Sequence, residues 1–232
     1  MRFDVPLKFG FLVRRYKRFL VDVEVPSCGI VTMYCPNTGA MTGYNDPGTR
    51  VWFSTSSSAK RKYAHTLEVV ESKGDYVCVH SALANSIIAE ALALKLIPEL
   101  LALPVQREVK IPGESGRFDF HLGEEIGDSV FVEVKSVTLC RGDRGVFPDA
   151  VSERAKRHAE ALLHCRQSGH RAVLLFCAPH TGIRSVSTAD DIYPEYGVVV
   201  RKAFSAGVEV LAYGCRVTPT EVVVDRALPV LL

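Results

Sequence analysis

The chain has 232 residues, of which 47% are hydrophobic and 23% charged, so it can bury a sizeable core and is no disordered tail. Lysine and arginine number 28 against 26 acidic residues, and the resulting net charge of +2 is too small to indicate a nucleic-acid or membrane partner. Any basic surface must therefore be local.

The pattern of apolar residues and cysteines indicates the cellular compartment of the protein. The sequence has no apolar run long enough to span a membrane, and its first ten residues, MRFDVPLKFG, lack the apolar stretch of a signal peptide. We therefore expect a soluble, cytoplasmic protein without a membrane partner. The seven cysteines are odd in number and form no C-x-x-C pair, which argues against a disulfide framework or a zinc ribbon.

Residues 1–81 are rich in short runs of alternating or β-branched residues, which are typical of strands. We predict strands over the following ranges: 9–13, 17–25, 29–34, 51–55, 63–71 and 75–80. The valines of LVDVEV alternate with Asp22 and Glu24, as in a strand with one buried face. Residues 1–81 are thus predicted to form an all-β domain with surface loops. Its 35–43 loop, CPNTGAMTG, fits either a close backbone approach to a ligand or a structural role.

The pattern changes at residue 82, where a helix over 82–96 is predicted, with Ser81 as its N-cap and Pro98 beyond its end. After this helix, strands alternate with helices, which predicts an α/β domain over residues 82–232. The further expected elements are strands over 107–111, 117–122, 129–139, 170–179 and 208–215, helices from Pro148 or Asp149 to Gln167 and within 195–205, and a valine-rich end.

Charged residues stand out within two of these strands. In VFVEVKSV, Glu133 and Lys135 emerge on the same face because successive side chains of a strand alternate. Asp119 lies on the preceding strand, and an antiparallel hairpin through the loop GEEIGD would place it beside Glu133. Mg²⁺ takes carboxylate oxygens as ligands, and a lysine ammonium stabilises charge on a phosphodiester. Asp119, Glu133 and Lys135 are thus candidate catalytic residues for metal-assisted hydrolysis, with both acids as metal ligands.

The same three residues have a plainer interpretation. Glu133 and Lys135 fit an ion pair on a half-exposed strand, with Asp119 as a cross-strand neighbour, because an E-x-K spacing is frequent by chance. Spacing alone leaves both interpretations open. A carbohydrate hydrolase that uses Glu124 and Glu125 is disfavoured, since adjacent residues on a hairpin tip do not flank a glycosidic bond.

Basic residues gather in three places, and each place suits contacts with the phosphates of a nucleic acid. The candidate nucleic-acid-binding residues are Arg14, Arg15, Lys17 and Arg18 in RRYKR, Lys60, Arg61 and Lys62 in AKRKY, and Arg154, Arg157 and His158 early in the long helix. The helical residues fit a solvated basic face equally well, with Glu153 and Arg157 as an i, i+4 ion pair.

The sequence resembles the sugar fermentation stimulation protein family nearly from end to end. Eight strings carry the resemblance, in this order: CPNTGAMTG, RKYAHTLE, ANSIIAEAL, REVKIPGESGRFDFHL, VFVEVKSVTL, FPDAVSERAKRH, RAVLLF and GVEVLAY. It implies an OB-like β-barrel over residues 1–81, followed over 82–232 by a PD-(D/E)XK nuclease-like α/β domain with a mixed sheet flanked by helices. It also implies DNA binding.

Carried over residue by residue, the nuclease-like pattern assigns its acidic pair to Asp119 and Glu133 and its lysine to Lys135, with Glu90 as a further acid and metal ligand. Glu90 equally fits a pair with a nearby cation inside a buried helix. Asn85, on the same helix, fits either the same cleft or a hydrogen bond in the first turns.

We therefore expect a cytoplasmic DNA-binding protein with a nuclease-like core that uses Mg²⁺ or Mn²⁺ to hydrolyse phosphodiesters, with little preference for sequence. The alternative is a DNA-binding regulator of sugar-utilisation genes that uses the same basic surfaces without cutting. The oligomeric state stays open, a homodimer included.

Overall fold

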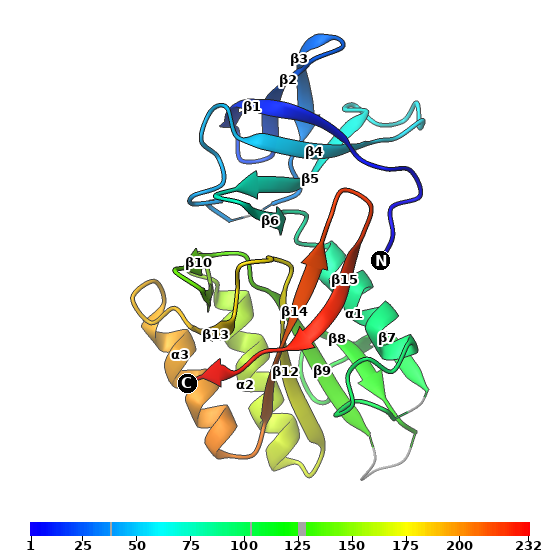
Figure 1. Ribbon diagram of the computed structural model, residues 1–232. Coiled ribbons are helices and arrows are strands. Elements are labelled where there is room, and N and C mark those ends of the chain that lie inside the picture. The colour runs from blue at the N-terminus through cyan, green and yellow to red at the C-terminus, as the bar shows by residue number, and fades with distance from the viewer. Residues whose placement is uncertain (38, 103, 125–128) are drawn as a thin grey trace.

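The computed structural model describes residues 1–37, 39–102, 104–124 and 129–232, which form two domains stacked end to end (Figure 1). One domain is a β-barrel, and the other is a sheet with helices on both faces. No helix in these described ranges has both the length and the apolar character needed to cross a bilayer.

The first domain is built from six strands. They are β1 (Lys8–Tyr16), β2 (Leu20–Val25), β3 (Gly29–Tyr34), β4 (Arg50–Thr55), β5 (His65–Ser72) and β6 (Asp75–Cys78). The sheet order is β3-β2-β1-β4-β5-β6, and a parallel pairing of Tyr34 with Thr66 joins β3 to β5, which closes the first five strands into a barrel. Val21, Val23 and Val25 fill its interior, as their alternation predicts.

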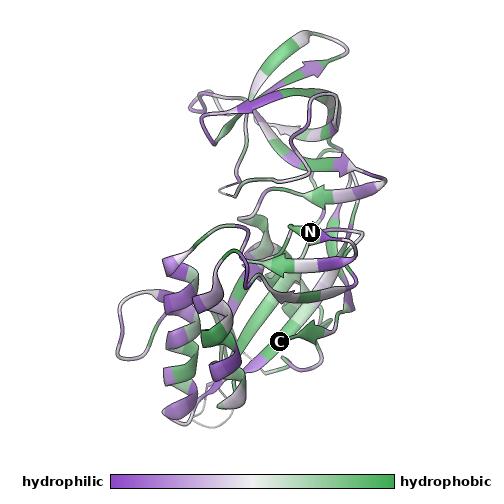
Figure 2. Ribbon diagram, turned by 90° about the vertical axis from the view of Figure 1, so that its left-hand side faces the viewer, coloured by the Kyte–Doolittle hydropathy of each residue, from purple (hydrophilic) through white to green (hydrophobic). Residues whose placement is uncertain are grey.

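The second domain contains a six-stranded mixed sheet. Its elements are α1 (Leu83–Ala93), β7 (Val105–Lys110), β8 (Arg117–Leu122), β9 (Val130–Ser136), α2 (Glu153–Gln167), β12 (Arg171–Ala178), α3 (Pro194–Ser205), β14 (Glu209–Val217) and β15 (Val222–Ala227). The order is β15-β14-β12-β9-β8-β7, with β9, β12 and β14 parallel. Helix α1 covers one face of the sheet, and α2 and α3 cover the other. Figure 2 shows the apolar strands of this sheet beside α2 and α3, which carry many hydrophilic residues.

The structure adds a second, smaller sheet that the sequence patterns do not predict. It consists of β10 (Cys140–Arg141), β11 (Arg144–Phe147), β13 (Ser185–Thr188) and β16 (Val230–Leu231), in the order β10-β11-β13-β16. Strands this short carry too little periodicity to be recognised.

The long helix starts later than predicted. It begins at Glu153 instead of Pro148 or Asp149, because Ser152 is its N-cap and accepts a hydrogen bond from the Ala155 amide at 3.2 Å. The start of α1 also differs, because the N-cap is Ala82 and the hydroxyl of Ser81 instead donates to a carbonyl of the 35–43 loop.

The N-terminal segment crosses from the barrel to the second domain. Arg2 forms an isolated antiparallel bridge with Glu221, and Leu7 packs into the core beneath α1. Figure 1 places the N-terminus beside α1 and β15. The first residues therefore tie the two domains together.

A buried tyrosine and histidine also link the domains. The hydroxyl of Tyr44, from the barrel, donates to the carbonyl of Thr138 at 2.9 Å and lies 2.9 Å from Nε2 of His180. Nδ1 of His180 accepts the amide N–H of Gly182, so Nε2 carries the ring hydrogen and donates to Tyr44. Burial lowers the pKa of His180 and favours this neutral form.

We expect Tyr44→Phe to lower the free energy of unfolding by about 1–3 kcal/mol, because it leaves the Thr138 carbonyl and the buried His180 N–H without a partner. Urea denaturation followed by circular dichroism measures this change. Tyr63→Phe is the control, since no described hydrogen bond involves the Tyr63 hydroxyl. Equal stability of the two variants would contradict the expectation.

Candidate active site

Strands β8 and β9 are paired at one end and diverge at the other, and Asp119 lies where they diverge. Their pairing runs from Leu122 to Phe120, and beyond it the amide N–H of Val134 donates to Oδ2 of Asp119 at 2.7 Å instead of to a strand carbonyl. Nδ2 of Asn85, on α1, donates to Oδ1 at 2.6 Å. The carboxylate is therefore fixed on both sides, by a strand and by a helix.

Glu133 lies on β9, and its side chain is 4% exposed. Its Oε1 accepts hydrogen bonds from Nζ of Lys135 and Nδ1 of His158, each at 2.5 Å. Its Oε2 is buried and has no hydrogen-bond partner among the described residues. One oxygen is thus held by two donors, while the other accepts no hydrogen bond from a described residue.

Burial and mutual repulsion govern the ionisation of the two acids. Burial raises the pKa of Asp119, and the negative charge of Glu133 raises it further. Burial alone would also raise the pKa of Glu133, but the hydrogen bond from His158 and the positive charge of Lys135 outweigh it and hold that pKa below its usual value. The structure therefore places a half-buried and a buried carboxylate within electrostatic reach of each other.

This arrangement suits a hard divalent cation. Such a cation takes oxygen ligands and would relieve both the repulsion between the acids and the unpaired Oε2 of Glu133. The described part of the chain holds no group of three or more His, Cys, Asp or Glu residues placed to bind a metal. Asp119 and Glu133 would therefore share the ion with water and substrate oxygens, as is usual for Mg²⁺.

Glu90 is not brought to this pair. Its carboxylate instead forms an ion pair with the N-terminal ammonium of Met1, which also donates to the carbonyl of Val222 on β15. Asn85 precedes Glu90 by five residues, which places the two side chains about 140° apart around the helix axis. Asn85, and not Glu90, is therefore the residue of α1 that meets Asp119.

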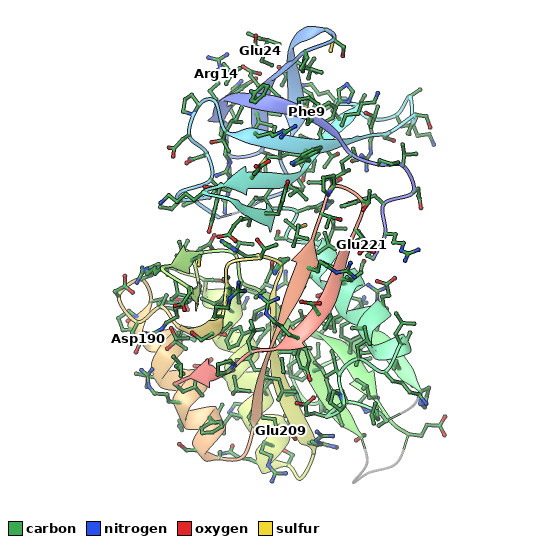
Figure 3. The ribbon with its side chains drawn as sticks, in the orientation of Figure 1. Phe9, Arg14, Glu24, Asp190, Glu209 and Glu221 are labelled. Atoms are coloured by element: carbon green, nitrogen blue, oxygen red, sulfur yellow. The ribbon has the colours of Figure 1, made fainter. Side chains whose placement is uncertain are left out.

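The basic segment RRYKR is used largely within the barrel. Arg14 forms an ion pair with Asp22 at 2.8 Å, at the end of the barrel far from the second domain (Figure 3). The guanidinium of Arg15 donates to four backbone carbonyls, three of them in the 35–43 loop, and the part of that loop that the structure describes has a structural role here. Lys17 and Arg18 are exposed at the turn that follows β1.

The second basic segment lies on an exposed loop of the barrel. Lys60, Arg61 and Lys62 are all exposed, with Arg61 donating to Thr66 and Lys62 lying over the ring of Tyr63. These three residues and the acid pair belong to different domains. Their contact with nucleic acid stays a prediction.

The basic residues of α2 divide into two groups. His158 is buried and its Nδ1 bonds Glu133, so it orients the acid, and its contact with a phosphate stays a prediction. Arg154 and Arg157 are exposed. The expected pair between Glu153 and Arg157 is not among the ion pairs of the described residues, because Glu153 accepts a hydrogen bond from the Tyr193 hydroxyl.

Sequence reasoning missed two neighbours of Glu133. The contact with His158 depends on the rotation of α2 over β9, which the local sequence does not encode. Tyr196, on α3, is fully buried with a hydroxyl that has no described partner, and burial together with the nearby charge of Glu133 raises its pKa. Of the two acids in the disfavoured hydrolase interpretation, Glu124 is exposed and Glu125 lies outside the described residues.

The fold and site define a two-domain protein with an OB-like barrel and an α/β domain that carries Asp119, Glu133 and Lys135. Residues 13–79 match the family model described as "SfsA N-terminal OB domain", and residues 82–221 match "Sugar fermentation stimulation protein RE domain". The chain belongs to the sugar fermentation stimulation protein family.

Relatives across the whole chain agree with this assignment. The chain is 45% identical to a sugar fermentation stimulation protein homolog of Shewanella sp. (strain MR-4), over 99% of both chains. It is 44% identical to the homolog of Hahella chejuensis, over 99% of this chain and 97% of the relative. The fold is that of Pyrococcus furiosus SfsA, solved in complex with Ca²⁺, with a TM-score of 0.88 at 24% identity over 100% of this chain and 98% of the other.

Proposed function

We propose that this protein binds DNA and hydrolyses its phosphodiester bonds with the help of Mg²⁺ or Mn²⁺ held by Asp119 and Glu133. The observation that carries the proposal is the buried Oε2 of Glu133, which has no hydrogen-bond partner among the described residues, beside an Asp119 carboxylate whose pKa is raised. A surface ion pair of Glu133 and Lys135 would be exposed, whereas these side chains are 4% and 11% exposed.

Each residue of the site has a definable task. When bound, the metal ion supplies an activated water and neutralises charge on the phosphate. Asn85 and the Val134 amide orient Asp119, and His158 orients Glu133 so that its second oxygen stays free. Lys135 keeps its ammonium beside Glu133, where it can donate to a phosphate oxygen and stabilise the charge that develops there.

One further observation supports the proposal. The Pyrococcus furiosus relative was solved with Ca²⁺, which shares with Mg²⁺ a preference for oxygen ligands. Contacts with phosphates carry no sequence information, so we expect binding with little sequence preference that weakens steeply as salt rises. The cytoplasm is the compartment in which we place this activity.

Incubation of supercoiled plasmid DNA with the protein tests the proposal. We expect nicking in Mg²⁺ or Mn²⁺ and none in EDTA, with rates at least about 10²-fold lower for Asp119→Ala and Lys135→Ala. Glu124→Ala, at an exposed acid, is the matched control and should cleave like the wild type. Circular dichroism establishes that each variant is folded.

DNA binding by the wild type without cleavage in any divalent metal would overturn the hydrolytic part of the proposal. The protein would then be a DNA-binding regulator, as the name of its family suggests. Cleavage that survives both substitutions would place the activity at another site.

A further inference from the structure

A hollow of about 480 Å³ lies between helix α2 and the turn that joins β7 to β8. Arg117 contributes from β8, and Arg154 and Arg157 contribute from α2. Glu114 and Glu160 also line it, so three guanidinium groups face two carboxylates and the hollow keeps a positive charge.

The three arginines have no partner among the described residues, which sets them apart from others in the chain. Arg141 pairs with Asp191 and Arg171 pairs with Glu209, each through two hydrogen bonds. No described ion pair or side-chain hydrogen bond involves the guanidinium of Arg117, Arg154 or Arg157. Their guanidinium donors are therefore free for a ligand in the hollow.

The neighbouring acids do not neutralise these arginines. Some of them contact other side chains, and those that line the hollow are fewer than the arginines. Glu153, one turn from Arg157, accepts the hydroxyl of Tyr193. Glu114 lies 2.6 Å from Nδ1 of His164. A hollow with unpaired guanidinium groups suits an oxyanion, because guanidinium presents a planar fork of donors that matches phosphate oxygens.

The hollow adjoins the acid pair. The ring of His158 forms part of its wall, while Nδ1 of the same ring bonds Oε1 of Glu133. Arg117 precedes Asp119 by two residues on β8. The imidazole ring of His158 would therefore lie between a phosphate in the hollow and the Glu133 carboxylate.

We infer that the hollow formed by Arg117, Arg154 and Arg157 binds a backbone phosphate of the nucleic-acid strand whose neighbouring phosphodiester lies at Asp119 and Glu133. The placement of the neighbouring phosphodiester at Asp119 and Glu133 rests on the proposed function. The binding of a phosphate in the hollow does not. It defines the substrate class, which is a strand that continues past the scissile bond and not an isolated phosphodiester.

Binding of a 20-base-pair duplex DNA, measured by fluorescence anisotropy in EDTA over a range of NaCl concentrations, tests the inference without turnover. The triple variant Arg117→Gln, Arg154→Gln and Arg157→Gln should bind at least about tenfold more weakly at low salt. The slope of log K against log[salt] should also become shallower by about 0.9 for each phosphate that the variant no longer neutralises. The control triple, Arg2→Gln, Lys95→Gln and Lys202→Gln, removes the same charge from exposed residues outside the hollow.

Equal weakening in the two triple variants, an unchanged affinity of the arginine variant, or no binding by the wild type would overturn the inference. Inorganic phosphate distinguishes a strand from a free anion as the ligand. Binding of inorganic phosphate to the hollow that leaves the affinity for DNA unchanged at constant ionic strength would indicate a free-anion site and also overturn it.

The two proposals fail in different ways. If the wild type cleaves DNA and the arginine variant binds DNA as well as the wild type, the inference about the hollow is wrong and the proposal of hydrolysis stands. If that variant binds DNA more weakly and the wild type cleaves in no metal, the proposal of hydrolysis is wrong and phosphate binding in the hollow stands.

Discussion

Glu133→Ala is expected to lower the free energy of unfolding by about 3–5 kcal/mol at neutral pH, the range for breaking a buried ion pair by removing one partner. Lys135 and His158 both donate to Oε1 of Glu133, and their side chains are only 11% and 10% exposed. Without the acid, neither donor has a replacement acceptor at that position, and the lysine charge stays buried. Burial of an unpaired charge is among the most destabilising changes available to a single substitution.

The pH dependence of this loss follows from the pKa of Glu133. That pKa is held below the usual value of about 4.3, so the stabilising contribution of the carboxylate is complete above the unfolded-state pKa. It disappears as the pH falls through the lower, folded-state value. The difference in stability between wild type and variant should therefore be constant near neutrality and shrink in acid.

Urea denaturation at several pH values measures both effects. Glu124→Ala is the control, and its unfolding free energy should stay within about 0.5 kcal/mol of wild type because Glu124 is exposed. Where Glu133→Ala does not yield folded protein, Glu133→Gln keeps the volume and one acceptor, and should show a smaller loss of the same sign. A loss below about 1 kcal/mol for Glu133→Ala would mean that the two donors are not held by the acid.

Those features of the site that depend on a single strand can be predicted from the sequence. Those that depend on packing between elements cannot. Side-chain alternation is a local property, so Glu133 and Lys135 share a face as predicted and their charges meet. The hairpin of β8 and β9 is likewise antiparallel, as predicted. Divergence of these strands at Asp119 is a tertiary feature, because the Val134 amide takes a side-chain acceptor in place of a backbone one.

The rotation of the helices against the sheet likewise cannot be predicted from the local sequence. The existence of α1 follows from its apolar residues, but its rotation against the sheet decides that Asn85 meets Asp119 while Glu90 pairs with the N-terminus. The N-terminus lies far away in the sequence, and no local pattern shows that it returns to this helix. The basic surroundings of His158 predict a phosphate contact, and the packing of α2 turns this side chain inward instead.

Asp119→Asn is expected to abolish hydrolysis and at the same time to stabilise the metal-free protein. Activity should fall by at least about 10²-fold, because the amide removes one of two negatively charged ligands. Stability should rise by about 1 kcal/mol, a usual gain when a strained functional residue is replaced. The reason is that burial and the charge of Glu133 both raise the pKa of Asp119 and so disfavour its ionised form.

The hydrogen bonds of Asp119 allow this gain. The new amide keeps an oxygen to accept the Val134 N–H, and its NH₂ group can donate to the side-chain oxygen of Asn85 once that amide turns over. The Val134 donor then keeps its acceptor, and the contact with Asn85 is kept with its direction reversed. The variant differs from wild type mainly by the loss of a buried charge.

The pH dependence has the opposite sign to that of Glu133. Because the pKa of Asp119 is raised on folding, the folded chain binds more protons than the unfolded chain between the two pKa values, and stability falls as the pH rises through that window. The variant lacks this penalty, so its advantage over wild type should grow from about pH 4 upward and then level off. Thermal denaturation in EDTA across this range measures the advantage, with Asp46→Asn as an exposed control. Added Mn²⁺ should then raise the melting temperature of wild type but not of Asp119→Asn, because only the wild type keeps both carboxylates. A melting temperature of the variant below that of wild type in EDTA would show that Asp119 is not under electrostatic strain.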